Sequence, residues 1–200
     1  PGSPTPMNLP HPRAHHDALL SPPGALLVVR APTAPPRPAP GQPGVVSDYV
    51  QDTPEIFVAV LADDAAPDGW RALAFNGHVD LGTGIRTALA QIVAGELGAD
   101  WRSVAVQPVS ASPIFANTLL ARAWAPAFLS ENIAIDADIG PIASSINEIA
   151  HRDMFVVTGG SSSIRQFEQP CREAGAAARA LLCQAAAARW DTSWEQCQTD

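Results

Sequence analysis

FNGHVDLGTGIRTALAQIVAGEL, running from Phe75 to Leu97, is the stretch that decides the fold. A β-like run leads into the turn Gly82-Thr83-Gly84. Apolar residues then recur at the spacing of a helix, at Ile85, Leu89, Ile92, Val93 and Leu97. A strand that ends in glycines and leads into a helix presents backbone N–H groups at the positive end of the helix dipole. The segment therefore predicts a strand–turn–helix unit whose turn can hold an anion.

A second segment, MFVVTGGSSSIRQFEQPCREAGAAARALL from Met154 to Leu182, has the same pattern. It predicts a short strand over 154–158, a glycine–serine turn and a long alanine-rich helix over 164–190. Serines at the helix start can cap it and donate to phosphate oxygens. Pro170 is tolerated only in a first helical turn, so we expect the regular helix to begin close to it. The small side chains over 174–188 permit close packing against another backbone.

The remaining pattern predicts an α+β fold, a mixed sheet with packed helices. Strands are expected over 55–63 and 70–81, forming a hairpin, and over 101–109, so that the helix after residue 84 makes a crossover. Shorter helices are expected over 113–123 and 140–150. We place this folded domain at residues 48–200.

Residues 1–47 hold most of the twenty prolines and predict an extended arm. The arm either wraps a partner subunit or is a flexible tail, and Gly24–Arg30 is a candidate strand within it. Since the proline arm and the alanine-rich helix leave little apolar area to bury, we expect the chain to fold against a partner.

Composition excludes several classes of function. The net charge is −8 and all twelve basic residues are arginine, which argues against a nucleic-acid surface and against a Walker-type phosphate site. No apolar run is long enough to span a membrane, and no signal-peptide or twin-arginine pattern is visible. Three cysteines cannot form a four-thiolate cluster, and no metal site is expected in the chain.

The two turns with their flanks resemble a known family. GHVDLGTGIRTALAQIVAGELG at 77–98 and TGGSSSIRQFEQPCREAGAAARALLCQAAAARW at 158–190 look like the two cofactor-binding segments of molybdenum-binding subunits of the xanthine dehydrogenase/aldehyde oxidase family. With FANTLLARA at 115–123, the second segment most resembles the large subunits of isoquinoline 1-oxidoreductase-type enzymes and their aldehyde-oxidising relatives. The resemblance covers about residues 50–195 and only the N-terminal, cofactor-binding portion of such a subunit.

The resemblance implies a molybdopterin cofactor, in its cytosine dinucleotide form. Gly82, Thr83 and Gly84 match the family's Gly-Gln-Gly turn, with Thr83 in place of the glutamine. The loop that holds the pterin end and pyrophosphate is matched by Gly159, Gly160, Ser161, Ser162 and Ser163. Gln91, on the helix after the first turn, is a further candidate.

The resemblance also implies oxidation of an N-heterocycle or an aldehyde, with oxygen from water and electrons leaving through [2Fe-2S] clusters. The family's catalytic glutamate matches no residue here, so no catalytic residue is assigned and the chain is not expected to act alone. Implied partners are the catalytic remainder of the molybdenum subunit as a separate chain, a small [2Fe-2S] subunit and, as candidate acceptor, a cytochrome c. A periplasmic or membrane-associated location is favoured over a cytoplasmic one.

Two alternatives bear on the same residues. A serine hydrolase built from His78, Asp80 and the serines is disfavoured because GGSSS lacks the nucleophile-elbow pattern. A structural or assembly subunit that keeps the fold without binding cofactor remains open, since Thr83 departs from the family pattern and the glutamate is missing.

Overall fold

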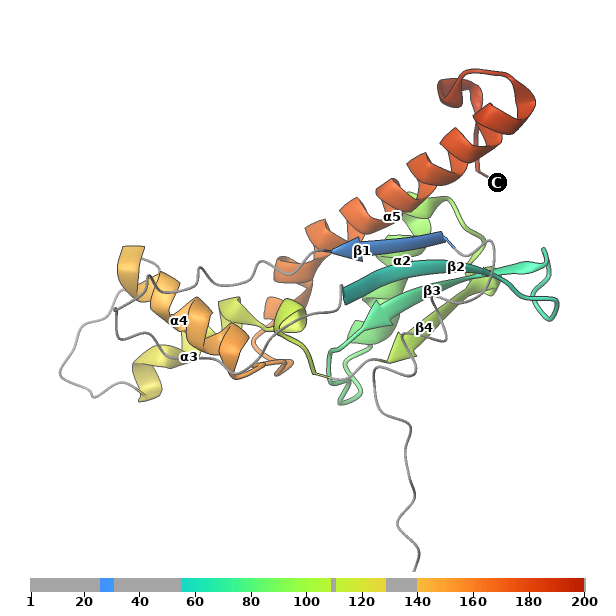
Figure 1. Ribbon diagram of the computed structural model, residues 1–200. Helices are drawn as coiled ribbons and strands as arrows, with labels where there is room; N and C mark the ends of the chain where they lie inside the picture. Colours follow the sequence, from blue (N-terminus) through green and yellow to red (C-terminus); the bar gives the residue numbers. More distant parts are fainter. Residues whose placement is uncertain (1–25, 31–54, 109–110, 129–139, 200) are drawn as a thin grey trace, which may run out of the picture.

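Four strands form one mixed sheet. The computed structural model describes residues 26–30, 55–108, 111–128 and 140–199. Strands β1 (Leu26–Arg30), β2 (Glu55–Ala62), β3 (Trp70–Asn76) and β4 (Val104–Pro108) lie side by side in that order (Figure 1). The pairs β1–β2 and β2–β3 are antiparallel and β3–β4 is parallel. The predicted α+β class with a mixed sheet is therefore confirmed.

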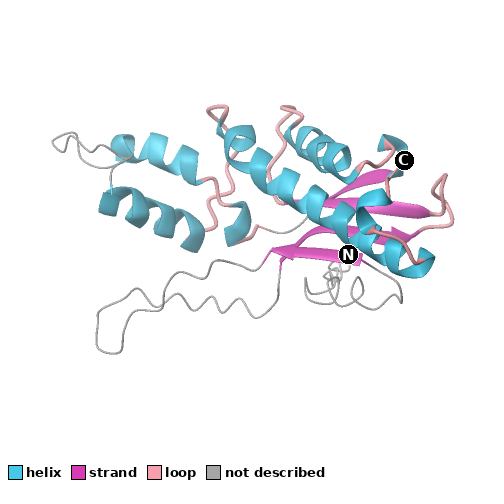
Figure 2. Cartoon of the chain, turned by 90° about the horizontal axis from the view of Figure 1, so that it is seen from above, coloured by secondary structure: helices cyan, strands magenta, loops and turns pink. Residues whose placement is uncertain are grey.

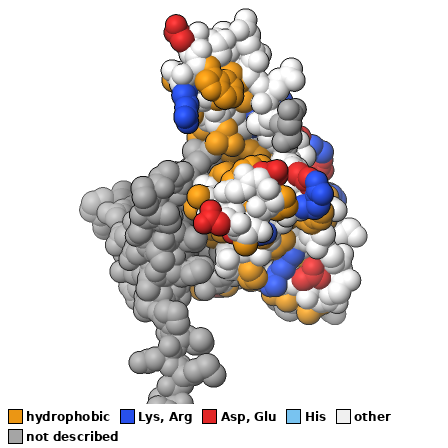
Figure 3. Space-filling model, turned by 90° about the vertical axis from the view of Figure 1, so that its right-hand side faces the viewer, with side chains coloured by type: hydrophobic (Ala, Val, Ile, Leu, Met, Phe, Trp, Pro, Cys, Tyr) orange, Lys and Arg blue, Asp and Glu red, His pale blue; other side chains and the backbone are white. Residues whose placement is uncertain are grey.

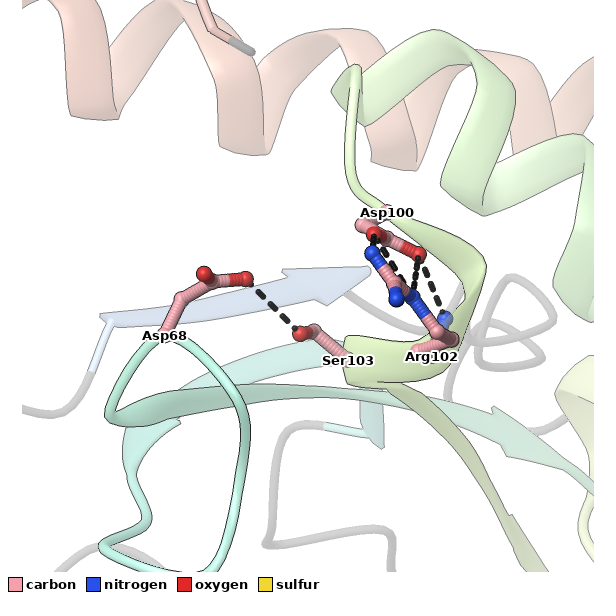
Figure 4. A network of polar contacts seen from close by, with 4 residues as sticks. All are labelled: Asp68, Asp100, Arg102 and Ser103. Atoms are coloured by element: carbon pink, nitrogen blue, oxygen red, sulfur yellow. Dashed lines mark hydrogen bonds and ion pairs between the residues drawn. The ribbon is translucent and has the colours of Figure 1, made fainter.

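Helix α2 (Ile85–Leu97) makes the predicted crossover between β3 and β4. A single 3₁₀ turn, η1 (Trp101–Ser103), precedes β4, so the strand predicted over 101–109 is shorter than expected. Asp100 caps this turn by accepting from the Arg102 backbone N–H at 2.9 Å and pairing with the Arg102 guanidinium (Figure 4). The Ser103 hydroxyl donates to Asp68 at 3.3 Å, which ties the β2–β3 turn to the start of β4.

Helix α5 (Ser162–Trp190) packs on α2, and the two helices cover one face of the sheet (Figures 1 and 2). Their apolar faces and the sheet bury one core, which includes Phe57, Leu89, Val93, Phe167 and Ala178. The helices approach closely at Gly175, where a Cβ atom would lie 2.6 Å from the Val93 carbonyl oxygen. The predicted close packing of the small residues is confirmed, and the backbone that they meet belongs to this chain.

Helices α3 (Thr118–Phe128) and α4 (Gly140–Arg152) pack against each other beyond the end of the sheet, on the left of Figure 1. A 3₁₀ turn, η2 (Pro113–Phe115), leads into α3. The start of α3 lies against the start of α5, which brings this helix pair next to the second glycine turn.

Three boundary predictions are wrong for identifiable reasons. The strand expected over 70–81 ends at Asn76, because the Asn76 side chain accepts from the His78 backbone N–H at 2.8 Å and turns the chain. No strand forms over 154–158. There, the Phe155 and Val157 carbonyls accept from Asn117 instead of from a neighbouring strand.

The third concerns Pro170. Helix α5 begins at Ser162, so Pro170 lies inside it and not in its first turn. Proline at such a position removes one backbone hydrogen bond, and the flanking bonds and the packing of Phe167 and Cys171 in the core keep the helix continuous.

Most of the predicted arm, residues 1–25 and 31–47, lies outside the described residues. The candidate strand within it is confirmed as β1 at the edge of the sheet. At the other end of the chain, Leu181, Trp190 and Trp194 are exposed, and Figure 3 shows hydrophobic side chains gathered there. No helix in the described part of the chain is long and apolar enough to cross a membrane.

Candidate functional site

The fold brings the two glycine turns together at one cavity of about 370 Å³. Thr83, Ile85 and Ala88 line it from the first turn and α2, and residues 158–164 line it from the second turn and α5. From the sequence, both turns were assigned to one cofactor, and in the structure residues of both turns line one cavity. Among the described residues that line the cavity, none has a titratable side chain.

The second turn presents backbone donors to this cavity. Gly160 has φ of +55° and Ser161 a φ of 50°, so the chain turns sharply just before α5 begins. In the described part of the chain, the N–H groups of Ser163 and Ile164 have no acceptor, as expected in a first helical turn. Thr158 also lines the cavity, and its hydroxyl oxygen is buried without a partner among the described residues. This wall is suited to an anionic or oxygen-rich ligand.

The serines do not cap the helix as predicted. Ser161 stands at the N-cap position without a side-chain hydrogen bond to the helix. The Ser162 hydroxyl donates to the Gly159 carbonyl at 2.7 Å, so its proton is committed to the turn. Ser162 and Ser163 are buried, 3% and 4% exposed, whereas Ser161 is exposed. Ser162 therefore shapes the loop.

The Asn117 side chain holds the second turn by hydrogen bonds. This residue was not singled out from the sequence. Its side-chain N–H group donates to the Val157 carbonyl at 2.9 Å and to the Ser162 hydroxyl at 2.7 Å. Its carbonyl oxygen caps α3 by accepting from the Leu120 N–H at 3.1 Å. An asparagine directly before an apolar helical run is a recognisable N-cap signal, but its second role required the fold.

Gln166 joins the same two elements from the other side. Its side-chain oxygen accepts from the Leu119 N–H at 2.9 Å, and its side-chain nitrogen donates to the Ala116 carbonyl at 2.6 Å. The starts of α3 and α5 are thus joined by two amide side chains that satisfy backbone groups, which fixes the second turn.

The first turn is built differently, around the Asp80 carboxylate. One oxygen of Asp80 accepts from the N–H groups of Gly82 at 2.9 Å and Gly84 at 3.1 Å, and the other accepts from Arg86 N–H at 3.4 Å. The Thr83 hydroxyl also lies 3.4 Å from Asp80. Burial alone would raise the pKa of Asp80, and the backbone donors outweigh it and hold that pKa below its usual value.

His78 lies just before this turn and is fully buried. Its Nδ1 donates to the Asn76 side-chain oxygen at 2.9 Å, and its ring meets the edge of Phe167 with centroids 4.3 Å apart. Burial, aided by the nearby Arg86 charge, lowers the pKa of His78 to about 4. Among the described residues His78 makes no hydrogen bond to a serine, so the His–Ser pair that a serine hydrolase would need does not form.

Of the remaining predicted residues, Gly82 and Gly84 adopt positive φ, 90° and 73°, and flank Thr83 without lining the cavity. Gln91 is exposed on α2 and does not line the cavity either. The described residues contain no group of three His, Cys, Asp or Glu side chains placed to hold a metal ion.

Two characterised proteins are similar to this chain. Over 165 residues, 78% of the chain, it is 30% identical to the beta subunit of isoquinoline 1-oxidoreductase from Brevundimonas diminuta. Over 81 residues, 40% of the chain, it is 47% identical to the B subunit of nicotinate dehydrogenase from Pseudomonas putida. The chain shows a distant, partial similarity to molybdenum hydroxylase large subunits.

The match covers 16% of the isoquinoline 1-oxidoreductase polypeptide and 6% of the nicotinate dehydrogenase polypeptide. No family model and no solved structure matches the chain. The similarity thus supports a relationship to a small part of these large subunits, and both relatives are named as subunits of larger enzymes.

Proposed function

We propose that the chain binds the anionic part of a molybdopterin cofactor, in its cytosine dinucleotide form, as one portion of a multi-chain oxidoreductase. The observation that carries the proposal is the cavity where the two glycine turns meet. The lining hydroxyls and the free amides at the start of α5 fit a pyrophosphate-like group, and a cavity of about 370 Å³ accommodates part of so large a cofactor.

The groups that would hold the cofactor are the free backbone amides within 160–164 together with the hydroxyls of Thr158, Ser161 and Ser163. When bound, the cofactor supplies the two-electron redox chemistry needed to oxidise a heterocycle with water. The described lining contains no acid or base, and in this proposal proton transfer and substrate binding are assigned to other chains, with electrons leaving through a [2Fe-2S] partner. Since both relatives are named for N-heterocycles, we favour an N-heterocycle over an aldehyde as substrate.

The proposal is tested by measuring molybdenum and acid-released cytidine monophosphate in the chain purified with the chains that accompany it. Gly160→Val is expected to lower both by roughly tenfold or more, a loss of about 1.4 kcal/mol or more in binding. Valine is strained at positive φ, and its Cβ would lie 3.1 Å from a Leu120 methyl group. Gly69→Val is the matched control, since Gly69 has φ of +75° in a hairpin turn away from the cavity.

The second candidate is a structural subunit that keeps the fold without holding cofactor. It is favoured by the state of the first turn, whose amides are already bound by Asp80. Cofactor that is present in the complex and unaffected by Gly160→Val would support this candidate. A preparation without molybdenum or pterin in any chain would contradict the oxidoreductase proposal.

A further inference from the structure

Both glycine turns were expected to present free backbone amides to an anion. They differ in whether those amides already have an acceptor within the chain. In the second turn, the amides of Ser163 and Ile164 have no acceptor among the described residues. In the first turn, the amides of Gly82 and Gly84 both donate to one oxygen of Asp80.

We propose that Asp80 is a positioning residue that fills the amide nest of the first turn, so that the cavity's anionic ligand is held at the second turn alone. Concave arrangements of successive backbone N–H groups bind anions. Here a side chain just before the turn supplies that anion from within the chain. The inference rests on the proposed function and specifies which of the two turns binds the ligand's negative charge.

Charge supports this division of roles. A carboxylate in the nest repels a phosphate group, and it leaves no donor of Gly82 or Gly84 for it. The pKa of Asp80 is held below its ordinary value, so the carboxylate stays ionised near neutral pH. Thr83 lines the cavity while Gly82 and Gly84 do not, so the amides of the two glycines lie outside the cavity lining. The Thr83 hydroxyl itself donates to Asp80 at 3.4 Å, so the first turn contributes shape and the second turn contributes the hydrogen-bond donors.

The test is a titration of the full, isotope-labelled chain with inorganic pyrophosphate, followed by the backbone amide signals of both turns. In the wild type we expect shifts at residues 160–164 and none at Gly82 and Gly84. In Asp80→Ala the nest is open, and we expect the shifts to extend to Gly82 and Gly84. Asp64→Ala, which removes an exposed acid from the β2–β3 turn, is the control and should respond like the wild type.

Asp80→Asn keeps an oxygen for the turn and removes the charge. We expect its turn to persist and its affinity for pyrophosphate to rise by a factor of about 2 to 10, because a nearby negative charge is gone. If Asp80→Ala fails to fold, this variant carries the test, and unchanged affinity would overturn the proposal.

Two further outcomes are decisive. Wild-type shifts at Gly82 and Gly84 would overturn the role of Asp80 and leave the proposed function standing. A wild type in which neither turn responds would count against the anion site itself, and so against the proposed function.

Discussion

Both glycine turns lead into a helix, yet their backbone N–H groups differ in whether they have an acceptor. In the first turn the amides donate to the Asp80 carboxylate. In the second turn amides remain without an acceptor among the described residues, and the Asn117 side chain holds the turn in place by hydrogen bonds. Glycines permit the bends in both, with positive φ at Gly82, Gly84 and Gly160. The comparison teaches that a glycine turn before a helix creates donors, and that side chains around it decide whether a ligand can use them.

The largest effect is expected from acid, which should lower the free energy of unfolding through His78, the buried residue just before the first turn. The ring is buried between the β3 end and Phe167 of α5, and its pKa of about 4 lies below the usual value near 6.5. The unfolded chain therefore takes up this proton first as the pH falls. Stability present above pH 6.5 is lost progressively down to pH 4, by an amount on the order of 3 kcal/mol.

Urea unfolding at several pH values measures this loss. His78→Gln, which has no titrating ring, is expected to lack this part of the acid dependence, whereas His151→Gln, on α4, should keep it. A wild-type free energy of unfolding that stays constant between pH 6.5 and 4 would show that His78 is accessible to protons in the folded state.

Removing the Asn117 side chain should loosen the second turn and leave the first turn intact. Asn117→Ala takes the donor from Val157 and Ser162 and the cap from α3, so we expect a loss of about 2 kcal/mol in the free energy of unfolding. Amide hydrogen exchange distinguishes the turns. Exchange should accelerate at Ser162, whose N–H donates to the Gly159 carbonyl, and remain unchanged at Gly82 and Gly84. Equal acceleration at both turns would refute a local role for Asn117.

The contact between the two helices gives a third comparison. Gly175→Ala places a methyl group 2.6 Å from the Val93 carbonyl oxygen, and we expect it to destabilise the protein by about 1–2 kcal/mol despite alanine's better helix propensity. Gly95→Ala is the matched control on α2, where the position is open, and it should stabilise by up to about 1 kcal/mol. Thermal unfolding of both variants should shift in opposite directions.

The smallest effect is expected at Arg172, which pairs across the helices with Glu96 and along α5 with Glu168. All three side chains are substantially exposed, so water and salt weaken the pairs. Arg172→Gln should lower the unfolding midpoint slightly at low ionic strength and not at all in high salt. A loss that persists in high salt would mean that the arginine acts through packing.

Periodicity was sufficient to predict most of the fold. The pattern from Ile85 to Leu97 predicted α2 almost to the residue, and the β-like runs around it predicted the crossover onto β4. Strand boundaries were predicted wrongly where side chains form hydrogen bonds with backbone groups. Asn76 ended β3 early, and Asn117 took the carbonyls that a strand at 154–158 would have used. Such contacts join distant parts of the chain, and hydrophobic spacing does not encode them.

For the site, glycine and serine content located both turns, and the structure placed Thr83 and the residues 159–163 around one cavity. The roles of individual side chains were less predictable. Ser162 bonds to its own loop, Gln91 lies outside the cavity lining, and nothing in the sequence indicated that Asp80 accepts from four donors. Those roles depend on which groups face each other in three dimensions.

The hydrogen bonds that Asn117 makes to the second turn have a consequence for assembly. Asn117 and Ser162 are 45 residues apart, and the facing wall comes from still earlier in the chain, so the cavity exists only once α5 has docked. Closing so long a loop is a late and entropically costly event in folding. A ligand of this cavity therefore binds the complete fold and not its precursors, and its concentration sets the apparent melting temperature by mass action.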